Sequence, residues 1–438
     1  MTTPTLVCDQ LPVETYRAPG KVKRIRALLG LDSLVNNSLH IMLTTAMMGA
    51  LGFAFWVVSA RLFTAEEVGV ATTLIGATSL ISYLSLFGVN SSVIRFLPVE
   101  ADHDAQISTA LLLVGGGGLV VASTYVLAAP VFAPSLSLVR SPLHAVSFVV
   151  LTACSAVNLL TDSVFIAYRA ARYNLVVDGC IQSGVKLALP LALVGLGSYG
   201  IFAASGLAAA AALGFSVLFL VRSFAFRPKF RIDRDVIRRT FRYSAANYVG
   251  SVLNILPLMV VPVIVLDGRG ASDAAFYYVA FQIANLLNAV AYAISQSLFA
   301  EGSYAESDLR RLVRRSAVLL GAVLVPATTV CLAGANLLLH VFGSSYARHG
   351  TGALVVLGLA IPAVALNSWT TALLRLSKQL GALIWSNVVF AVGICGLSAL
   401  WVSRGLTWVA FAWLVGNLAS GVVGGVAFAL RPQEARHR

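Results

Sequence analysis

The feature that most constrains this chain is a series of apolar runs, each about 20 residues long, separated by short segments that carry nearly all of its charge. A helix needs roughly 20 mainly apolar residues to cross the hydrocarbon core of a bilayer. Only 11% of the 438 residues are charged, whereas a soluble domain carries about 25%. A chain with so few charges cannot cover itself with a water-facing surface. The pattern therefore predicts an all-α polytopic membrane protein.

The runs predict twelve transmembrane helices in two six-helix lobes and leave no room for a separate soluble domain. The predicted spans are 39–60, 70–94, 107–129, 143–168, 174–194, 200–221, 243–266, 274–299, 314–334, 352–374, 381–402 and 408–430. We expect a basic N-terminal segment (1–38), an N-lobe (39–221), a basic inter-lobe loop (222–242), a C-lobe (243–430) and a short tail (431–438).

The basic residues predict the orientation of these helices. With twelve spans, all of the 31 lysines and arginines fall on the side that holds both termini, apart from Lys186, Arg61, Arg140, Arg269, Arg348 and Arg404. Short cytoplasmic loops carry an excess of lysine and arginine. Both termini are therefore predicted to be cytoplasmic, and the protein is predicted to be a multi-pass protein of the cell (inner or plasma) membrane.

A weak internal repeat supports the six-plus-six plan. The fourth predicted span has Asn158 and Thr161 three residues apart, and the tenth has Asn367 and Thr370 at the same spacing. Two halves of six spans share their orientation, as in parallel repeats related by an axis along the membrane normal. Such lobes enclose a substrate site near the bilayer midplane, which predicts transport by alternating access.

Ionisable residues inside a membrane are costly and are therefore candidate functional residues. Asp162, Asp178 and Lys186 lie within predicted spans four and five, and Arg61 and Arg95 lie at the ends of spans one and two. One interpretation is a buried Asp–Lys pair that joins two helices. The other is that Lys186 presents positive charge to an anionic substrate while an aspartate titrates during transport. Arg61 and Arg95 are close enough to an interface to reach water.

The second half carries amides in place of charges. Gln282, Asn285 and Asn288 recur every three residues in span eight, and Asn367 lies in span ten. An amide offers donors and an acceptor, which suits sugar hydroxyls. The same groups also join neighbouring helices in membranes, so both interpretations remain open.

Other chemistry is absent from the sequence. There is no P-loop pattern, and the cysteines and histidines lack metal-ligand spacing. We expect no catalytic residues, no metal and no cofactor, so the chain is not expected to be an enzyme. Coupling to an H⁺ or Na⁺ gradient is the form of energy input that these residues allow.

Two segments resemble a known family. The stretches FWVVSARLFTAEEVG and LFGVNSSVIRFLP, within Gly49 to Pro98, are similar to the first two helices of Wzx-type oligosaccharide flippases. The stretch YYVAFQIANLLNAVAYAISQSLFAEGS, Tyr277 to Ser303, resembles the eighth helix of that family and the loop after it. These flippases belong to the multidrug/oligosaccharidyl-lipid/polysaccharide (MOP) superfamily, and the length and twelve-span plan agree over the whole chain.

The resemblance implies a transporter that moves a polyprenyl-diphosphate-linked oligosaccharide across the membrane for cell-surface polysaccharide biosynthesis. It implies cationic residues in the N-lobe that attract the diphosphate, a role for which Lys186, Arg61 and Arg95 are the candidates. Gln282, Asn285, Asn288 and Asn367 are candidate glycan contacts, and Asp162 and Asp178 are candidate ion-coupling residues. Expected partners are the bilayer, the lipid-linked oligosaccharide and, further, a glycan polymerase or glycosyltransferases, with no nucleic acid.

Two alternatives remain. A MATE-type exporter of the same superfamily would use Asp162 and Asp178 to bind H⁺ or Na⁺ and a cationic drug or metabolite. A non-transporting membrane scaffold for glycan assembly would use the basic loop 222–242 to dock partner enzymes.

Overall fold

A computed structural model describes residues 33–100, 102–132, 141–229, 234–304, 309–377 and 379–430. The regular structure in these ranges is helical throughout. Eleven helices are long and apolar enough to cross a membrane, and a bent pair, α14 (Ser344–Leu359) with α15 (Ile361–Leu376), forms a further span with a 40° bend. The predicted fold of about twelve transmembrane helices is confirmed.

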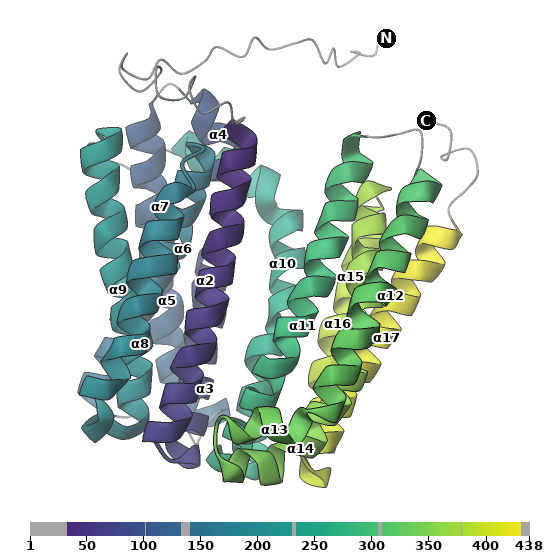
Figure 1. The fold of residues 1–438 in the computed structure, drawn as a ribbon. Coiled ribbons are helices and arrows are strands. Elements are labelled where there is room, and N and C mark those ends of the chain that lie inside the picture. Colours follow the sequence, from purple (N-terminus) through teal and green to yellow (C-terminus); the bar gives the residue numbers. More distant parts are fainter. Residues whose placement is uncertain are drawn as a thin grey trace.

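The helices form two bundles that lie side by side in Figure 1. The first holds α2 (Ser33–Leu62), α3 (Ala65–Ser85), α4 (Val89–Phe96), α5 (His103–Phe132), α6 (Pro142–Ala167), α7 (Arg172–Asn174), the π-helix η3 (Leu175–Gln182), α8 (Ser183–Ala192) and α9 (Gly197–Phe224), with short 3₁₀ turns at η1 (Leu97–Val99) and η4 (Val194–Leu196). The second holds α10 (Arg234–Arg269), α11 (Ala271–Tyr304), α12 (Leu309–Ala333), α13 (Ala335–His340), α14, α15, α16 (Leu380–Trp401), η5 (Val402–Arg404) and α17 (Leu406–Ala429). The division between bundles falls between α9 and α10.

The second predicted span, 70–94, is wrong at both ends. α3 begins earlier because Thr64 caps it: its side chain accepts from the Glu67 N–H, and the Glu67 carboxylate accepts from the Thr64 N–H, which is a capping box. α3 ends at Ser85 because Phe87 and Gly88 have positive φ angles of 47° and 75°. This left-handed turn separates α4 from α3, so the chain changes direction before Arg95.

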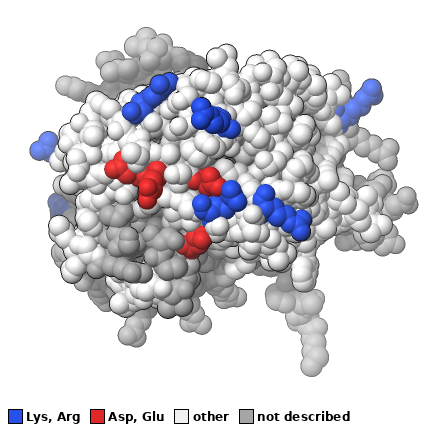
Figure 2. All heavy atoms as spheres, turned by 90° about the horizontal axis from the view of Figure 1, so that it is seen from below, with Lys and Arg blue, Asp and Glu red and all other residues white. Residues whose placement is uncertain are grey.

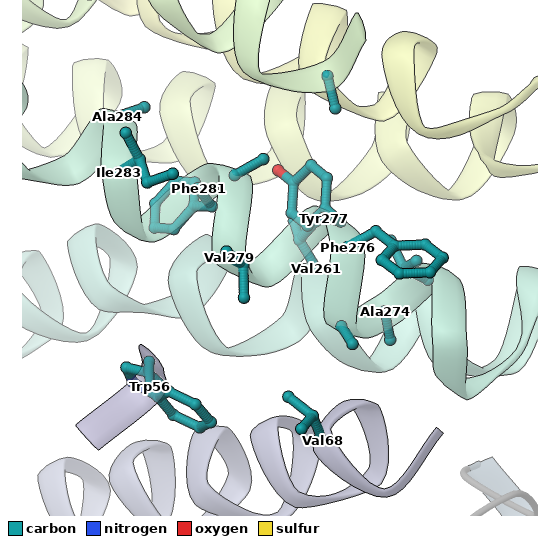
Figure 3. Packing of buried hydrophobic residues seen from close by; sticks show 14 of the residues in the cluster. Trp56, Val68, Val261, Ala274, Phe276, Tyr277, Val279, Phe281, Ile283 and Ala284 are labelled. Atoms are coloured by element: carbon teal, nitrogen blue, oxygen red, sulfur yellow. The ribbon is translucent and has the colours of Figure 1, made fainter. Parts of the chain in front are cut away.

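The largest apolar core joins the two bundles. It includes Trp56 and Val68 of the first bundle and Val261, Ala274 and Phe281 of the second, as Figure 3 shows. α3 contacts both α10 and α11. The two helices pack closely at Gly69, where an added Cβ would overlap the carbonyl group of Ala271. Only glycine permits the backbones to approach this closely.

α2 of the first bundle and α11 of the second bundle approach each other at one end only. Near its C-terminal end α2 buries Phe55 and Trp56, but near its start Met42 is 68% exposed. α11 shows the opposite order, with Ala274 and Val279 buried near its start and Leu286 47% exposed beyond them. Because the two helices run in opposite directions, the start of α2 and the end of α11 both lie at the upper end of Figure 1, where the two helices diverge. The bundles therefore meet at the lower end, and α2 and α11 are separated at the upper end.

A second contact line keeps the bundles together along α3 and α10. The hydroxyl of Tyr248, in α10, donates to the carbonyl oxygen of Leu84 at the end of α3, at 2.6 Å. Tyr248 also lies beside Phe87, with ring centroids 6.4 Å apart. These residues lie toward the upper end, so the separation of α2 from α11 does not extend to this side of the molecule.

Candidate functional site between the two bundles

Lys186 is a cation without a carboxylate partner among the described residues. Its ammonium nitrogen lies 4.7 Å from the ring centroid of Phe55, which is fully buried in α2. The described ion pairs join Lys229 with Asp102 and Arg269 with Asp273, so the Asp178–Lys186 pair, one of the two interpretations of the sequence, does not form. A cation over an aromatic face gains about 0.5–2 kcal/mol and keeps its charge available to a ligand. The residue as a whole is partly buried.

The aromatic ring under Lys186 belongs to a chain of contacts that crosses between the bundles. Phe55 meets Trp56 edge to face at 4.9 Å, and Trp56 meets Tyr278 of α11 at 4.8 Å. The Gln282 amide then donates to the Tyr278 hydroxyl at 3.0 Å. A candidate cation in the N-lobe and a candidate amide in the C-lobe are thus joined through three aromatic rings. Sequence reasoning missed these rings; the adjacent Phe55-Trp56 pair near the end of an apolar span was the signal for them.

Asp162 and Asp178 lie together, as their placement in spans four and five predicts. Their carboxyl groups are within hydrogen-bonding reach of each other. The Asn158 amide donates to Asp178 Oδ1 at 3.0 Å. Asp178 is 2% exposed, while Asp162 is partly exposed. The pair sits between α6 and the π-helix η3, toward the upper end of the bundle, and a π-helix within an α-helical span is frequently a functional feature.

Arg61 does not face an open site in this structure. Its Nε donates to the carbonyl oxygen of Val341 and its Nη2 to that of His340, both at 2.9 Å. These carbonyls end α13, where a cation is favoured by the helix dipole. The nearby ring contact of Phe53 with Phe342, at 5.2 Å, joins the same segments. In this structure Nε and Nη2 of Arg61 are therefore occupied in a contact between the bundles, and its diphosphate contact stays a prediction.

Arg95 lies on α4, at the upper end of the first bundle. Its guanidinium stacks 5.6 Å from the Phe96 ring centroid, and its side chain is exposed. Because the turn at Phe87 and Gly88 ends α3, Arg95 lies on a short surface helix and not at depth in a span. The structure does not bring Arg95 into contact with Lys186.

The three amides of α11 do not form one stripe. Gln282 and Asn285 are partly exposed on the face that continues to Leu286, while Asn288 is 3% exposed on the buried side. A spacing of three residues turns each side chain 60° short of a full revolution, so the third amide leaves the face of the first. Gln282 and Asn285 remain accessible candidates for a ligand, and Asn288 does not.

Asn367, predicted as a glycan contact, is buried and joins neighbouring helices by hydrogen bonds. Its amide donates to Asn417 Oδ1 at 3.2 Å, and its oxygen accepts from the Ser420 hydroxyl at 2.8 Å. Ser420 also exchanges contacts with Ser386 of α16. The side chain is 6% exposed, so α15, α16 and α17 enclose it, and its hydrogen-bonding capacity serves packing.

The lower face carries few charges, separated by wide uncharged areas. Figure 2 shows lysines and arginines beside acidic side chains there, with no field of one sign. Arg269 and Asp273 form an ion pair at this end, and Arg404 stacks on Trp408 at 5.3 Å. This face therefore offers no concentrated charge that would bind a polyanion. Within the described residues no group of three or more His, Cys, Asp or Glu side chains is placed to hold a metal ion.

The arrangement of the helices in two bundles that meet at one end is similar to that of solved transporters of the MOP superfamily. The solved structure of an inward-facing multidrug-resistance MATE transporter aligns with a TM-score of 0.71 at 15% identity, covering 93% of this chain and 99% of that one. The outward-facing form aligns at 0.64 and 14%, covering 92% and 96%. A MOP transporter from Pyrococcus furiosus, reported with a binding pocket of reversed polarity, aligns at 0.61 and 13%, covering 93% and 96%.

The sequence gives the family. Residues 58–351 match the family model described as polysaccharide biosynthesis protein. This range is well over half of the chain, and the chain belongs to that family. A comparison with curated proteins found no match.

Proposed function

We propose that this protein flips a polyprenyl-diphosphate-linked oligosaccharide across the cell membrane by alternating access, as a step in cell-surface polysaccharide biosynthesis. The observation that carries the proposal is Lys186, a cation in a membrane span that lies over the Phe55 ring and forms none of the described ion pairs. An unpaired charge at this depth is costly. A charge that binds an anionic substrate offsets this cost, whereas a charge that only fills space between helices does not.

The site matches the three parts of such a substrate. A diphosphate needs positive charge, which Lys186 supplies, and the exposed Arg95 on α4 offers a first contact at the membrane surface. A glycan needs hydrogen-bond partners, which the partly exposed Gln282 and Asn285 offer. A polyprenyl tail needs hydrocarbon, and the separated faces of α2 and α11 carry apolar side chains such as Met48 and Leu286.

The same proposal includes orientation, energy input and partners. The predominance of basic residues on the upper side supports placing that side in the cytoplasm, so the opening between α2 and α11 would receive substrate from the inner leaflet. Energy would come from an H⁺ or Na⁺ gradient acting at Asp162 and Asp178. A glycosyltransferase would supply the lipid-linked substrate, and a polymerase or ligase would consume it on the outer side.

The test is the fate of the lipid-linked oligosaccharide in the native host. The gene is deleted and replaced by the wild type, Lys186→Ala, Lys186→Arg or Lys229→Ala. Lipid-linked glycans are quantified in membranes, and their leaflet is assigned by digestion of spheroplasts with a membrane-impermeant glycosidase. We expect Lys186→Ala to accumulate protected, inner-leaflet glycan at least tenfold and Lys186→Arg to recover part of the transport.

Lys229→Ala is the matched control, because Lys229 pairs with Asp102 outside the spans. It should behave as the wild type, and immunoblots must show equal amounts of each variant in the membrane. Lipid-linked pools that are unchanged by deletion of the gene would overturn the proposal.

A MATE-type antiporter is the second candidate, favoured by the adjacent carboxyl groups of Asp162 and Asp178 and by a fold similar to that of MATE transporters. The same strains distinguish it. An antiporter predicts a lowered tolerance to cationic drugs on deletion, together with normal lipid-linked pools, and a loss of that tolerance in Asp178→Asn.

A further inference from the structure

Two deeply buried hydrogen-bond donors of the second bundle lack acceptors. Tyr277 of α11 is 2% exposed, and Trp413 of α17 is 3% exposed. The Tyr277 hydroxyl and the Trp413 indole Nε1 have no hydrogen-bond partner among the described residues. Buried polar atoms without partners are few in native proteins, and each one requires an explanation.

Both side chains line the same small cavity, which lies between α10, α11 and α17. Val261 of α10 and Phe281 of α11 line it as well, and Figure 3 shows them beside Tyr277. The cavity volume is about 10 Å³, which is the room that one water molecule needs. Two unpaired donors and a cavity of this size are therefore found at one place.

A backbone carbonyl is the third polar group at this cavity. Pro262 lies inside α10 and has no N–H, so the helix lacks the bond that position 262 would donate to the carbonyl oxygen of Leu258. Leu258 and Pro262 both line the cavity. Carbonyl groups freed by proline in membrane helices are satisfied by neighbouring helices, by hydroxyl side chains or by ordered water. Neither the Tyr277 hydroxyl nor the Trp413 indole donates to this carbonyl.

From these three groups we propose that one water molecule is bound in the cavity. It accepts from the Tyr277 hydroxyl and from the Trp413 N–H, and it donates to the Leu258 carbonyl oxygen. Three hydrogen bonds are the usual number for a buried water. Chloride would accept from both donors, but it cannot donate to the carbonyl oxygen, and none of the residues that line the cavity carries a positive charge.

The water site lies beside the contact between the bundles. Tyr278 lines the same cavity and meets Trp56 of the first bundle at 4.8 Å. α10 contacts α3 of the first bundle in addition to α11. The bound water therefore ties the proline break of α10 to α11 and α17 at the end where the bundles meet. This inference does not depend on which substrate the protein carries.

X-ray radiolysis followed by mass spectrometry tests the site. Hydroxyl radicals formed from a bound water oxidise the side chains beside it, even where bulk solvent does not reach. The purified full-length chain in lipid nanodiscs is exposed for milliseconds, and the oxidation rate of each residue is corrected for its intrinsic reactivity. Tyr346 is the internal control, because it is 3% exposed and its hydroxyl is also unpaired, but it does not line the cavity. We expect Tyr277 and Trp413 to be oxidised at least fivefold faster than Tyr346.

Two proline variants test the role of the carbonyl. Pro262→Ala restores the N–H that bonds the Leu258 carbonyl and so removes the acceptor of the water, and the oxidation of Tyr277 should fall at least threefold. Pro257→Ala is the matched control. Pro257 also lines the cavity, but the carbonyl that it frees belongs to Leu253, which is not among the lining residues. This variant should keep the wild-type rate.

The thermal midpoint of each variant shows whether it folds. Tyr277→Phe removes one donor and leaves the proline in place, so it should lower the oxidation of Trp413 even if Pro262→Ala does not fold. Equal rates for Tyr277 and Tyr346, or equal effects of the two proline variants, would overturn the water site. Rates that change when gluconate replaces chloride in the buffer would assign the cavity to an anion and overturn it as well.

Discussion

The Nε atom of Arg61 donates to the carbonyl oxygen of Val341, 280 positions later in the chain, at 2.9 Å. With the second bond to His340, this contact fastens the end of α2 to the end of α13 and closes the lower end of the molecule. The alternating-access cycle proposed above requires this end to open. We therefore expect Arg61 to stabilise the closed state of the lower end and to be released when that end opens.

Replacing Arg61 with alanine should shift the population toward forms open at the lower end. Hydrogen bonds to charged groups contribute about 1.5–3 kcal/mol when buried, and the exposure of Arg61 reduces this to about 1 kcal/mol, or roughly a fivefold change in the equilibrium. The measurement is the spin-label distance between Leu196 and Leu337, both exposed near the lower end of their bundles, in a background without native cysteines. Arg404→Ala is the control, because Arg404 contacts Trp408 within one bundle. Equal distance distributions for Arg61→Ala and wild type would refute the role.

Gly69→Ala should separate α3 from α11. A Cβ at this position would meet backbone atoms of Ala271, which cannot rotate away as a side chain can. We expect a lower thermal midpoint and a broader Leu196–Leu337 distance distribution. Gly52→Ala is the matched control, because nothing lies within 4 Å of an added Cβ there. In that helix alanine should be neutral or stabilise by up to about 1 kcal/mol, and a similar response in both variants would contradict close packing at Gly69.

Asn367→Ala should destabilise the C-lobe whatever the substrate. The change removes the buried donor to Asn417 Oδ1 and one of the acceptors of the Ser420 hydroxyl, which costs about 1–3 kcal/mol. Thermal unfolding of the purified variant measures this loss, with Asn336→Ala, an exposed amide bonded only to Thr351, as control. A variant with wild-type stability and impaired glycan transport would restore Asn367 as a ligand contact.

The segment after α9 should loosen at low pH. The ammonium group of Lys229 hydrogen-bonds the carboxylate of Asp102 and lowers the pKa of that carboxyl. Because the folded pKa is below the ordinary value of about 3.9, the contribution is present above that value and is lost as pH falls through the lowered pKa. Hydrogen exchange at the Lys229 amide, which donates to Ser108, should accelerate relative to its intrinsic rate on acidification. Asp102→Asn should show the faster rate already at pH 7, and Glu66→Gln should not.

The fold followed from the sequence because it depends on composition, run length and charge distribution, which act over whole segments. The repeat also has a structural counterpart. Thr161 donates to the Asn158 carbonyl at 2.7 Å, and Thr370 donates to the Asn367 carbonyl at 3.1 Å. Both asparagines are buried and bond to a neighbouring helix, so the repeated spacing records a shared packing device in α6 and α15.

The site was predictable only in part. The contact between Asp162 and Asp178 follows from two helices joined by a short turn, and it was predicted. The partner of Arg61 was not predicted, because α13 lies far along the chain. Whether the Arg61 side chain bonds backbone carbonyls or a ligand depends on which end of the molecule is closed. The change of face at Asn288 and the turn at Gly88 depend on rotations within one helical turn, which apolar patterning does not resolve.

The π-helix at Leu175–Gln182 has a consequence for comparisons among relatives. A π-helix is equivalent to an α-helix that has gained one residue, and each residue turns the following helix by about 100°. Lys186 comes four residues after this segment, and its direction toward Phe55 depends on that extra residue. A relative without it would carry a lysine in the same alignment column but on another side of the helix. The residue equivalent to Lys186 in a relative is therefore the cation on the same face of the helix. In a sequence alignment that residue can stand one position away from Lys186.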